Sequence, residues 1–209
     1  MKILTHKKPT AGIILAAGMS SRLGSPKQLL RFKGKYLLEW VLEACLNSDL
    51  ESLFLVLGNE SGKILKAVSE TAGHPRIRTV ICHRYREGQS QSLRAGLSET
   101  RENFSSVMFL LGDQPLADSK MINYLLDSFW KSDKGICVPA WKGKRGNPTV
   151  FSREYYSQLM GIEGDIGARK IIQENFENVL FAEIDNPKCF SDIDTQEDVE
   201  IFRDSLIAD

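Results

Sequence analysis

Apolar runs rich in β-branched residues alternate along this chain with segments whose apolar residues recur at helical spacing. The strand-like runs lie at residues 11–17, 50–58, 76–82, 105–115, 135–141, 147–151 and 178–184. The helix-like segments lie at residues 36–49, 60–73, 90–103, 117–133, 167–176 and 194–207. Because strands and helices alternate, the pattern predicts an α/β fold in which a mostly parallel sheet carries helices on both faces.

Two of the predicted helices begin at neighbouring residues that both favour helix caps. The helix that starts near residue 117 has Asp118 or Ser119 as its cap, and the last helix has Asp194 or Thr195. The sequence leaves both alternatives open.

Length and composition indicate a single domain over residues 1–209, with an extension at about residues 1–10 and an irregular insertion near residues 140–167. Hydrophobic residues make up 42% of the chain and charged residues 26%, as in ordinary globular proteins. Lys and Arg together number 27, as do Asp and Glu, and this balance argues against a nucleic-acid partner. No apolar run approaches the roughly 18 residues that span a bilayer, which argues against a membrane partner.

The four cysteines, Cys45, Cys82, Cys137 and Cys189, are far apart in the sequence. They form neither a CxxC pair nor the spacing of a zinc site, and the three histidines are scattered as well. This usage is typical of a reduced, cytoplasmic enzyme or binding protein without zinc.

The loop GMSSRLGSPK, residues 18–27, follows the first predicted strand and is rich in small residues. Small residues let backbone N–H groups approach a ligand from one side, an arrangement that binds phosphate. Arg22 adds a planar fork of donors, and Lys27 adds a mobile point charge. The loop therefore predicts a polyphosphate site, although it matches neither a Walker A loop nor GxGxxG. The alternative is a connection whose charges are merely solvated.

Asp113 comes just after the buried run that ends in VMFLLG, between Gly112, which permits a tight turn, and Pro115, which fixes the exit. Ligands of open α/β sheets bind at the carboxyl ends of the strands. A carboxylate there, across from a phosphate loop, suits Mg²⁺, which takes one or two carboxylates together with substrate phosphates. The alternative is that Asp113 only stabilises the turn.

Asp192 and Asp194 alternate on a short segment that is expected to be extended. Side chains two residues apart on an extended segment point the same way, so the two carboxylates are expected to share a site. If Asp194 instead caps the last helix, this expectation fails.

Six stretches together resemble the molybdenum cofactor cytidylyltransferases, a MobA-like group with a Rossmann-like nucleotide-diphosphosugar transferase fold. The stretches are LAAGMSSRLGSPK, GQSQSLRAGL, LLGDQP, RGNPTVF, GDIGAR and DIDTQEDV, and they run from residue 15 to residue 199. Each is weak by itself, but their order and spacing are specific. Gln89 departs from the family pattern, which often has Met there.

The resemblance implies roles for the matching residues. It implies that CTP is bound by Leu15, Ala16, Ala17, Gly18, Ser20, Ser21, Arg22, Lys27, Ser92 and Gly112. It implies that the acceptor is bound by Arg145, Gly146, Asn147, Pro148, Asp165, Gly167, Ala168 and Arg169. It implies catalytic roles for Arg22, Lys27 and Asp113, and Mg²⁺ held by Asp113 and Asp194.

Local chemistry alone offers plainer interpretations of the later stretches. Ser92 is a polar residue in the first turn of a predicted helix, and Asp165 is a candidate helix cap. Residues 142–151 form a basic turn that is typical of an exposed hairpin. The acceptor roles therefore rest on the resemblance.

The activity implied by the resemblance is Mg²⁺-dependent transfer of CMP from CTP to the molybdopterin cofactor, with release of pyrophosphate. Related guanylyltransferases read LAGG where this chain reads LAAG, so Ala17 favours CTP over GTP. The resemblance also implies, as a downstream partner, a molybdenum hydroxylase or its accessory protein. Two alternatives stay open: an enzyme of the same fold with another nucleotide or acceptor, and a non-catalytic protein that delivers the cofactor.

Overall fold

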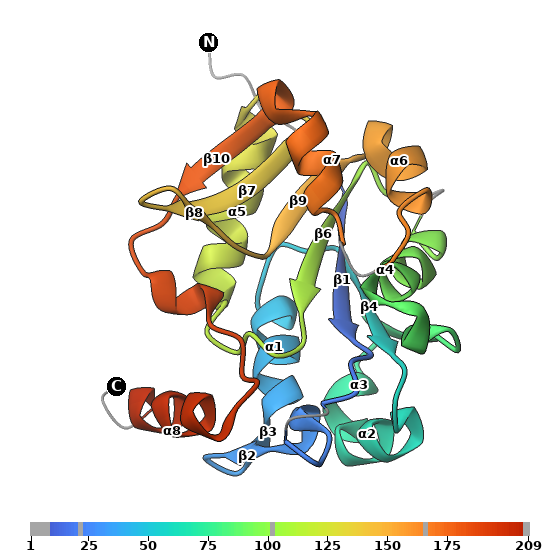
Figure 1. Ribbon diagram of the computed structural model, residues 1–209, viewed down its shortest axis with the longest axis vertical. Coiled ribbons are helices and arrows are strands. Elements are labelled where there is room, and N and C mark those ends of the chain that lie inside the picture. The colour runs from blue at the N-terminus through green and yellow to red at the C-terminus, as the bar shows by residue number, and fades with distance from the viewer. Residues whose placement is uncertain (1–8, 21–22, 101–102, 165–166, 207–209) are drawn as a thin grey trace.

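An eight-stranded sheet runs through the described part of the chain, which comprises residues 9–20, 23–100, 103–164 and 167–206 of this computed structural model (Figure 1). The strands of this sheet are β1 (Thr10–Ala16), β4 (Ser52–Leu57), β5 (Ile77–Ile81), β6 (Ser106–Leu111), β7 (Ile136–Trp141), β8 (Lys144–Arg145), β9 (Thr149–Ser152) and β10 (Val179–Glu183). Seven of them lie in the order β10-β7-β9-β6-β1-β4-β5, and β8 pairs with β7. A separate ribbon is formed by β2 (Arg31–Phe32) and β3 (Lys35–Tyr36).

Parallel pairing dominates the sheet. β1 pairs in parallel with β4 and β6, as β4 does with β5 and β7 with β10. β9 runs antiparallel to both β6 and β7, so β6 and β7 point the same way. The mostly parallel sheet is thus confirmed, and one edge collects the carboxyl ends of the parallel strands together with the amino end of β9.

Helices cover both faces of the sheet (Figure 1). They are α1 (Leu37–Leu46), α2 (Ser61–Ala67), α3 (Ser69–Ala72), α4 (Gln89–Ser98), α5 (Ser119–Lys131), α6 (Tyr156–Met160) and α7 (Arg169–Glu174). A further helix, α8 (Gln196–Ser205), lies away from the sheet faces. Short 3-10 turns lie at Lys27–Leu29, Tyr85–Glu87, Arg153–Tyr155, Phe176–Asn178 and Pro187–Phe190. Among the described helices, none combines the length and apolar character that crossing a membrane requires.

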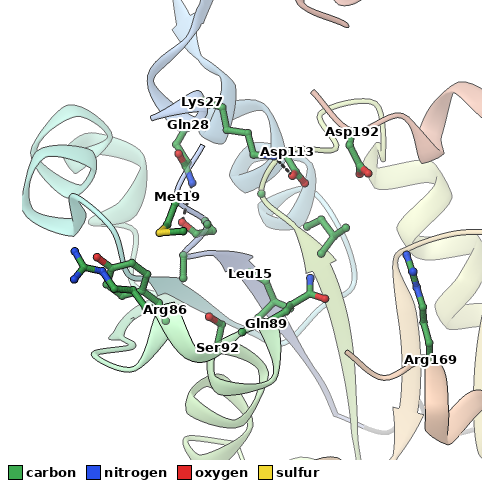
Figure 2. A pocket seen from close by; sticks show the side chains of 17 residues that line it. Leu15, Met19, Lys27, Gln28, Arg86, Gln89, Ser92, Asp113, Arg169 and Asp192 are labelled. Carbon is green, nitrogen blue, oxygen red and sulfur yellow. Dashed lines mark hydrogen bonds and ion pairs between the residues drawn. The ribbon is translucent and has the colours of Figure 1, made fainter. Parts of the chain in front are cut away.

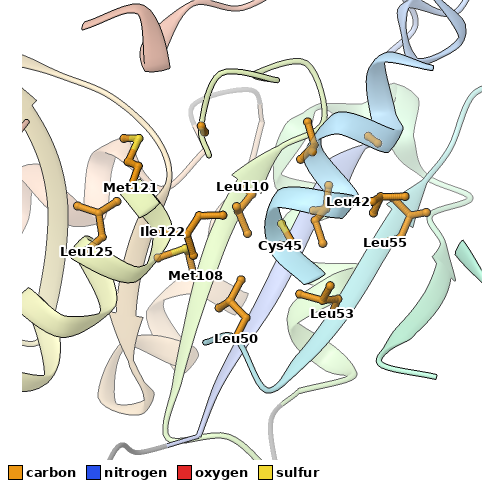
Figure 3. Packing of buried hydrophobic residues seen from close by; sticks show 14 of the residues in the cluster. Leu42, Cys45, Leu50, Leu53, Leu55, Met108, Leu110, Met121, Ile122 and Leu125 are labelled. Carbon is orange, nitrogen blue, oxygen red and sulfur yellow. The ribbon is translucent and has the colours of Figure 1, made fainter. Parts of the chain in front are cut away.

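Alternate side chains of the central strands enter two separate cores. On β6, Met108 and Leu110 join the cluster formed with α1, α2, α3 and α5, whereas Val107 and Phe109 join the cluster formed with α4, α6 and α7. Figure 3 shows the first cluster, in which Leu42 of α1 lies among side chains of β4, β6 and α5. Because both faces are buried, these strands read as continuous apolar runs in the sequence.

A third, smaller cluster attaches the C-terminal helix to the β2–β3 ribbon. Phe202 of α8 packs edge-on against Phe32 of β2, with ring centroids 4.7 Å apart. Ile193, which precedes α8, is buried in the same cluster. The segment leading into α8 is thereby fixed at the carboxyl edge of the sheet.

The two uncertain helix caps are resolved by hydrogen bonds. The side chain of Asp118 accepts from the backbone N–H of Met121 at 2.8 Å and caps α5. Thr195 caps α8, because its hydroxyl accepts from the backbone N–H of Asp198 while the Asp198 carboxylate accepts from that of Thr195. Asp194 is therefore not the cap, and its carboxylate bonds elsewhere.

The helix predicted over residues 60–73 is wrong as a single element. Val68, which is fully buried, takes φ −100° and ψ 21° and separates α2 from α3. Packing of this β-branched side chain in the core takes precedence over helical continuity, a common tertiary override of local preference.

Gly96 allows α4 to lie directly on the sheet, and we expect its replacement to loosen that contact. A Cβ at residue 96 would collide with the side chain of Ile13 and lie 2.9 Å from Cγ2 of Val56. Gly96→Ala should lower the free energy of unfolding by about 1–3 kcal/mol, as measured by urea denaturation. The control is Gly62→Ala in α2, where the added Cβ meets no atom within 4 Å beyond its chain neighbours and the backbone of its own helix. It should be neutral or stabilising, and equal losses in both variants would contradict the packing argument.

Candidate active site

A cavity of about 470 Å³ opens at the carboxyl edge of the sheet. Its walls come from the ends of β1 and β6, the turn after β5, the start of α4 and the segment before α8. The lining residues are Leu15, Ala16, Ala17, Gly18, Met19, Lys27, Gln28, Tyr85, Arg86, Gly88, Gln89, Ser92, Leu111, Gly112, Asp113, Arg169 and Asp192 (Figure 2). Most of the residues predicted to bind the nucleotide are thus brought together.

The loop after β1 is held in place by Gln28. This buried side chain donates through Nε2 to the carbonyl of Ala16 at 2.9 Å, and its Oε1 accepts from the Ser20 hydroxyl at 3.5 Å. The Ser20 Oγ in turn accepts from the backbone N–H of Lys27 at 3.0 Å. These bonds fix the base of the Lys27 side chain beside the end of β1. Ser21 and Arg22, both predicted to bind the nucleotide, lie outside the described residues.

Gly112 makes the turn after β6 possible, as the sequence predicts. A Cβ there would lie 2.8 Å from Cβ of Ala16 and 3.3 Å from the carbonyl oxygen of Leu15. The backbone N–H of Gly112 instead donates to that Leu15 carbonyl at 2.9 Å. Only glycine permits this approach, which places Asp113 next to the loop after β1.

Lys27 joins the two carboxylates predicted to bind the metal. Its ammonium donates to Oδ2 of Asp113 and, at 2.5 Å, to Oδ1 of Asp194. The Lys27 side chain is only 12% exposed, that of Asp113 20% and that of Asp194 42%. Burial lowers the pKa of Lys27, but the two carboxylates outweigh it and hold the pKa above its usual value. The ammonium is therefore charged at neutral pH.

Asp192 brings a third carboxylate to this cluster. Nε2 of Gln114 donates to Oδ1 of Asp192 at 2.7 Å and to the carbonyl of Phe190 at 3.3 Å. Burial and the nearby charges of Asp113 and Asp194 raise the pKa of Asp192. Between the two aspartates, Ile193 points into the small core and donates its backbone N–H to the carbonyl of Asp113 at 3.0 Å. Asp192 and Asp194 therefore face the same cluster, as their alternation predicts.

The donor atoms of the cluster suit a hard divalent cation. Oδ1 of Asp113 and Oε1 of Gln114 are buried and make no hydrogen bond within the described part of the chain. Carboxylate and amide oxygens are the ligands that Mg²⁺ prefers. Among the described residues, no three His, Cys, Asp or Glu side chains converge closely enough to hold a metal by themselves. A metal here would need further ligands from a substrate, which is the usual arrangement for Mg²⁺ at phosphates.

The opposite wall of the cavity contains residues that the sequence did not single out. Tyr85 and Arg86 follow β5, and the guanidinium of Arg86 lies 5.6 Å from the centre of the Tyr85 ring. Their position just after a strand end is the sequence feature from which they could have been predicted. Ser92 lines this wall as predicted and is 95% buried, since its exposed fraction is 5%. In Figure 2, Arg86 and Arg169 flank the cavity from opposite sides.

Most residues predicted to bind the acceptor surround two smaller cavities. One, of about 90 Å³, is lined by Asn147, Gly167, Ala168 and Arg169, among others. The other, of about 200 Å³, is lined by Arg145, Gly146, Asn147 and Arg169, among others. Arg169 also lines the large cavity, so the three spaces are neighbours.

Two of the acceptor predictions, Pro148 and Asp165, have a different outcome, whereas Arg145 lines a cavity from a hairpin. Pro148 is not among the lining residues of these cavities, and Asp165 lies outside the described residues. Arg145 belongs to the β7–β8 hairpin, and its guanidinium lies 5.1 Å and 4.7 Å from the ring centres of Phe176 and Phe181. The exposed hairpin expected from local chemistry is thus present, and it borders the cavity of about 200 Å³.

Comparison with known proteins identifies the family. A probable molybdenum cofactor guanylyltransferase of Thermococcus sibiricus is 28% identical over 71% of this chain and 71% of its own length. Purine catabolism protein PucB of Bacillus subtilis is 25% identical over 93% of this chain and 96% of its own. The crystal structure of Rv0371c from Mycobacterium tuberculosis superposes with a TM-score of 0.81 at 27% identity, covering 95% of this chain and 99% of that one. The model of the MobA-like NTP transferase domain matches residues 12–179, and the chain belongs to this family of nucleotidyltransferases.

Proposed function

We propose that this protein transfers CMP from CTP to the terminal phosphate of the molybdopterin cofactor, giving the cytosine dinucleotide form and pyrophosphate. The observation that carries the proposal is the convergence of Lys27, Asp113 and Asp194 at a cavity whose floor is the small-residue loop after β1. Cations beside a loop of this kind suit a triphosphate. The proposal treats residues 1–209 as one nucleotidyltransferase domain.

The nucleotide is proposed to lie along the loop after β1, with its triphosphate toward Lys27 and its base toward Ser92. This placement is supported by residues that line the large cavity, namely Leu15–Gly18, Ser92 and Gly112. Ser20 lies in the loop after β1 and bonds to the backbone of Lys27. Ser21 and Arg22 are proposed to bind the phosphates on the strength of their sequence. Mg²⁺ would be held by Asp113 and Asp194, and when bound it neutralises charge on the phosphates.

The acceptor is proposed to occupy the smaller cavities near Arg145, Asn147 and Arg169, with Asp165 and Pro148 contributing from the same segments. An oxygen of its phosphate attacks the α-phosphorus of CTP, the bond from that phosphorus to the bridging oxygen breaks, and pyrophosphate leaves. A phosphate monoester has a second pKa of about 6, so it is already ionised and needs no strong base. Positioning and charge neutralisation therefore suffice for catalysis.

The main alternative is the same transfer from GTP. It is favoured by the relative from Thermococcus sibiricus, which carries the name of a guanylyltransferase. CTP is favoured by Ala17, which lines the cavity where guanylyltransferases are expected to have glycine. The Ala17 methyl also packs against the end of β4, since a Cβ on Gly58 would lie 2.9 Å from it.

Thermal unfolding with Mg²⁺ and each of CTP, GTP, ATP and UTP tests the nucleotide. CTP at 100 times its Kd should add about 2.7 kcal/mol of stability, more than the other nucleotides at equal concentration. Asp113→Asn should abolish the Mg²⁺-dependent part of this gain, whereas Asp127→Asn, an exposed carboxylate on α5, should leave it intact. Pyrophosphate release with molybdopterin then tests the reaction. A larger gain with GTP would assign the guanylyl reaction, and absence of pyrophosphate would contradict transferase activity.

Ala17→Gly tests base selection. Removing one methyl group from the wall of a cavity changes discrimination between ligands by about 1–3 kcal/mol, or roughly tenfold or more. We therefore expect the ratio of kcat/KM for CTP to that for GTP to fall by about tenfold. Ala44→Gly in α1 lies away from the cavity and controls for lost stability. An unchanged ratio in Ala17→Gly would mean that this methyl does not select the base.

A further inference from the structure

The ammonium of Lys27 lies between two carboxylates from different parts of the chain. Asp113 follows β6 and Asp194 precedes α8, and both accept a hydrogen bond from the same Nζ. The backbone N–H of Lys27 is fixed by Ser20, but the four-carbon side chain beyond it has several rotatable bonds. The charged head can therefore move while its base stays in place.

Within the described part of the chain, Lys27 does not satisfy all the oxygens of this cluster. Its ammonium bonds to Asp113 and Asp194, with Asp192 close by, and Oδ1 of Asp113 stays buried without a hydrogen bond among the described residues. An ammonium offers three donors, whereas a divalent cation carries twice the charge and accepts six or more oxygen ligands. The same oxygens would thus be better satisfied by a divalent cation than by Lys27.

Both cations cannot occupy the cluster together. The Lys27 ammonium contacts the carboxylate oxygens directly, and the Lys27 side chain as a whole is only 12% exposed. At such distances like charges repel strongly because little water lies between them. A triphosphate in the adjoining cavity, which Lys27 also lines, offers the ammonium an alternative set of anionic partners.

We propose that Lys27 is an internal counter-cation of the metal site. In the nucleotide-free protein its ammonium binds the carboxylates of Asp113 and Asp194. When a triphosphate binds, the ammonium moves to the phosphates and a divalent metal binds the two carboxylates in its place. The inference rests on the proposed function in taking Asp113 and Asp194 as the metal-binding pair. Free metal then binds weakly, and metal and nucleotide strengthen each other's binding. By linkage, the factor is the same in both directions.

Mn²⁺ alone, titrated into the full chain and followed by electron paramagnetic resonance of the free ion, tests the proposal without any nucleotide. Lys27→Met should bind Mn²⁺ about tenfold more tightly than the wild type, since it removes the competitor. If Lys27→Met does not fold, Lys27→Gln replaces it, because its amide can still donate hydrogen bonds to the carboxylates. It should also bind Mn²⁺ more tightly than the wild type. Lys35→Met is the matched control, because Lys35 forms a 2.5 Å ion pair with Glu43 outside the cavity. It should bind Mn²⁺ as the wild type does.

Two outcomes would overturn the proposal. In one, neither Lys27 variant binds Mn²⁺ more tightly than the wild type. In the other, the gain persists when Asp113→Asn is added, which would put the metal elsewhere. Neither outcome depends on the base or the acceptor, so a failure here is distinguishable from a failure of the cytidylyl reaction, which pyrophosphate release reports.

Discussion

The close parallel pairing of β1 with β6 is the constraint on which the candidate site depends. The two strands are in register up to Leu15 opposite Leu111, and the backbone of Gly112 then bonds directly to Leu15. Because both faces of these strands are buried, neither strand can shift without disturbing both cores. The core therefore fixes the two strand ends, and the turn at Gly112 and the loop after β1 bring Asp113 and Lys27 together beside them.

The charged cluster is not explained by stability. Taking an ammonium and carboxylates out of water costs much of what their attraction returns, so apolar residues in such a place are often equally stable or more so. Here the polar atoms are nonetheless held in position from several sides, by Gln28 and Ser20 under Lys27 and by Gln114 beside Asp192. A supporting layer of this kind is what a site needs when charges must be aligned before a ligand arrives.

The sequence predicts those features that depend on local pattern. Apolar runs predict the parallel strands. Because ligands bind where such strands end, the positions of Lys27 and Asp113 after predicted strands indicate the site. The direction of β9 carries no signal in a four-residue run, and only the sheet shows that it is antiparallel to its neighbours. Gln28 and Gln114 were missed for a similar reason, because their roles depend on tertiary contacts. Gln28 bonds across the loop to Ala16, and Gln114 bonds to Asp192 from a distant segment, so their neighbours in the sequence do not reveal them.

The large cavity and the 90 Å³ cavity share lining residues, and this bears on how the two proposed substrates could react. Gln89 lines both spaces and lies against Gly167, where a Cβ would come within 2.8 Å of its Oε1. Gly167 has φ 58°, a conformation that favours glycine. The side chain of Gln89 therefore packs against the backbone of residue 167. Arg169, two residues on, borders all three cavities. Group transfer requires reacting atoms about 3–3.5 Å apart. In the proposed reaction, two phosphates bound in these neighbouring cavities would have to approach to that distance, and Arg169, which borders both cavities, is the cation placed to contact both.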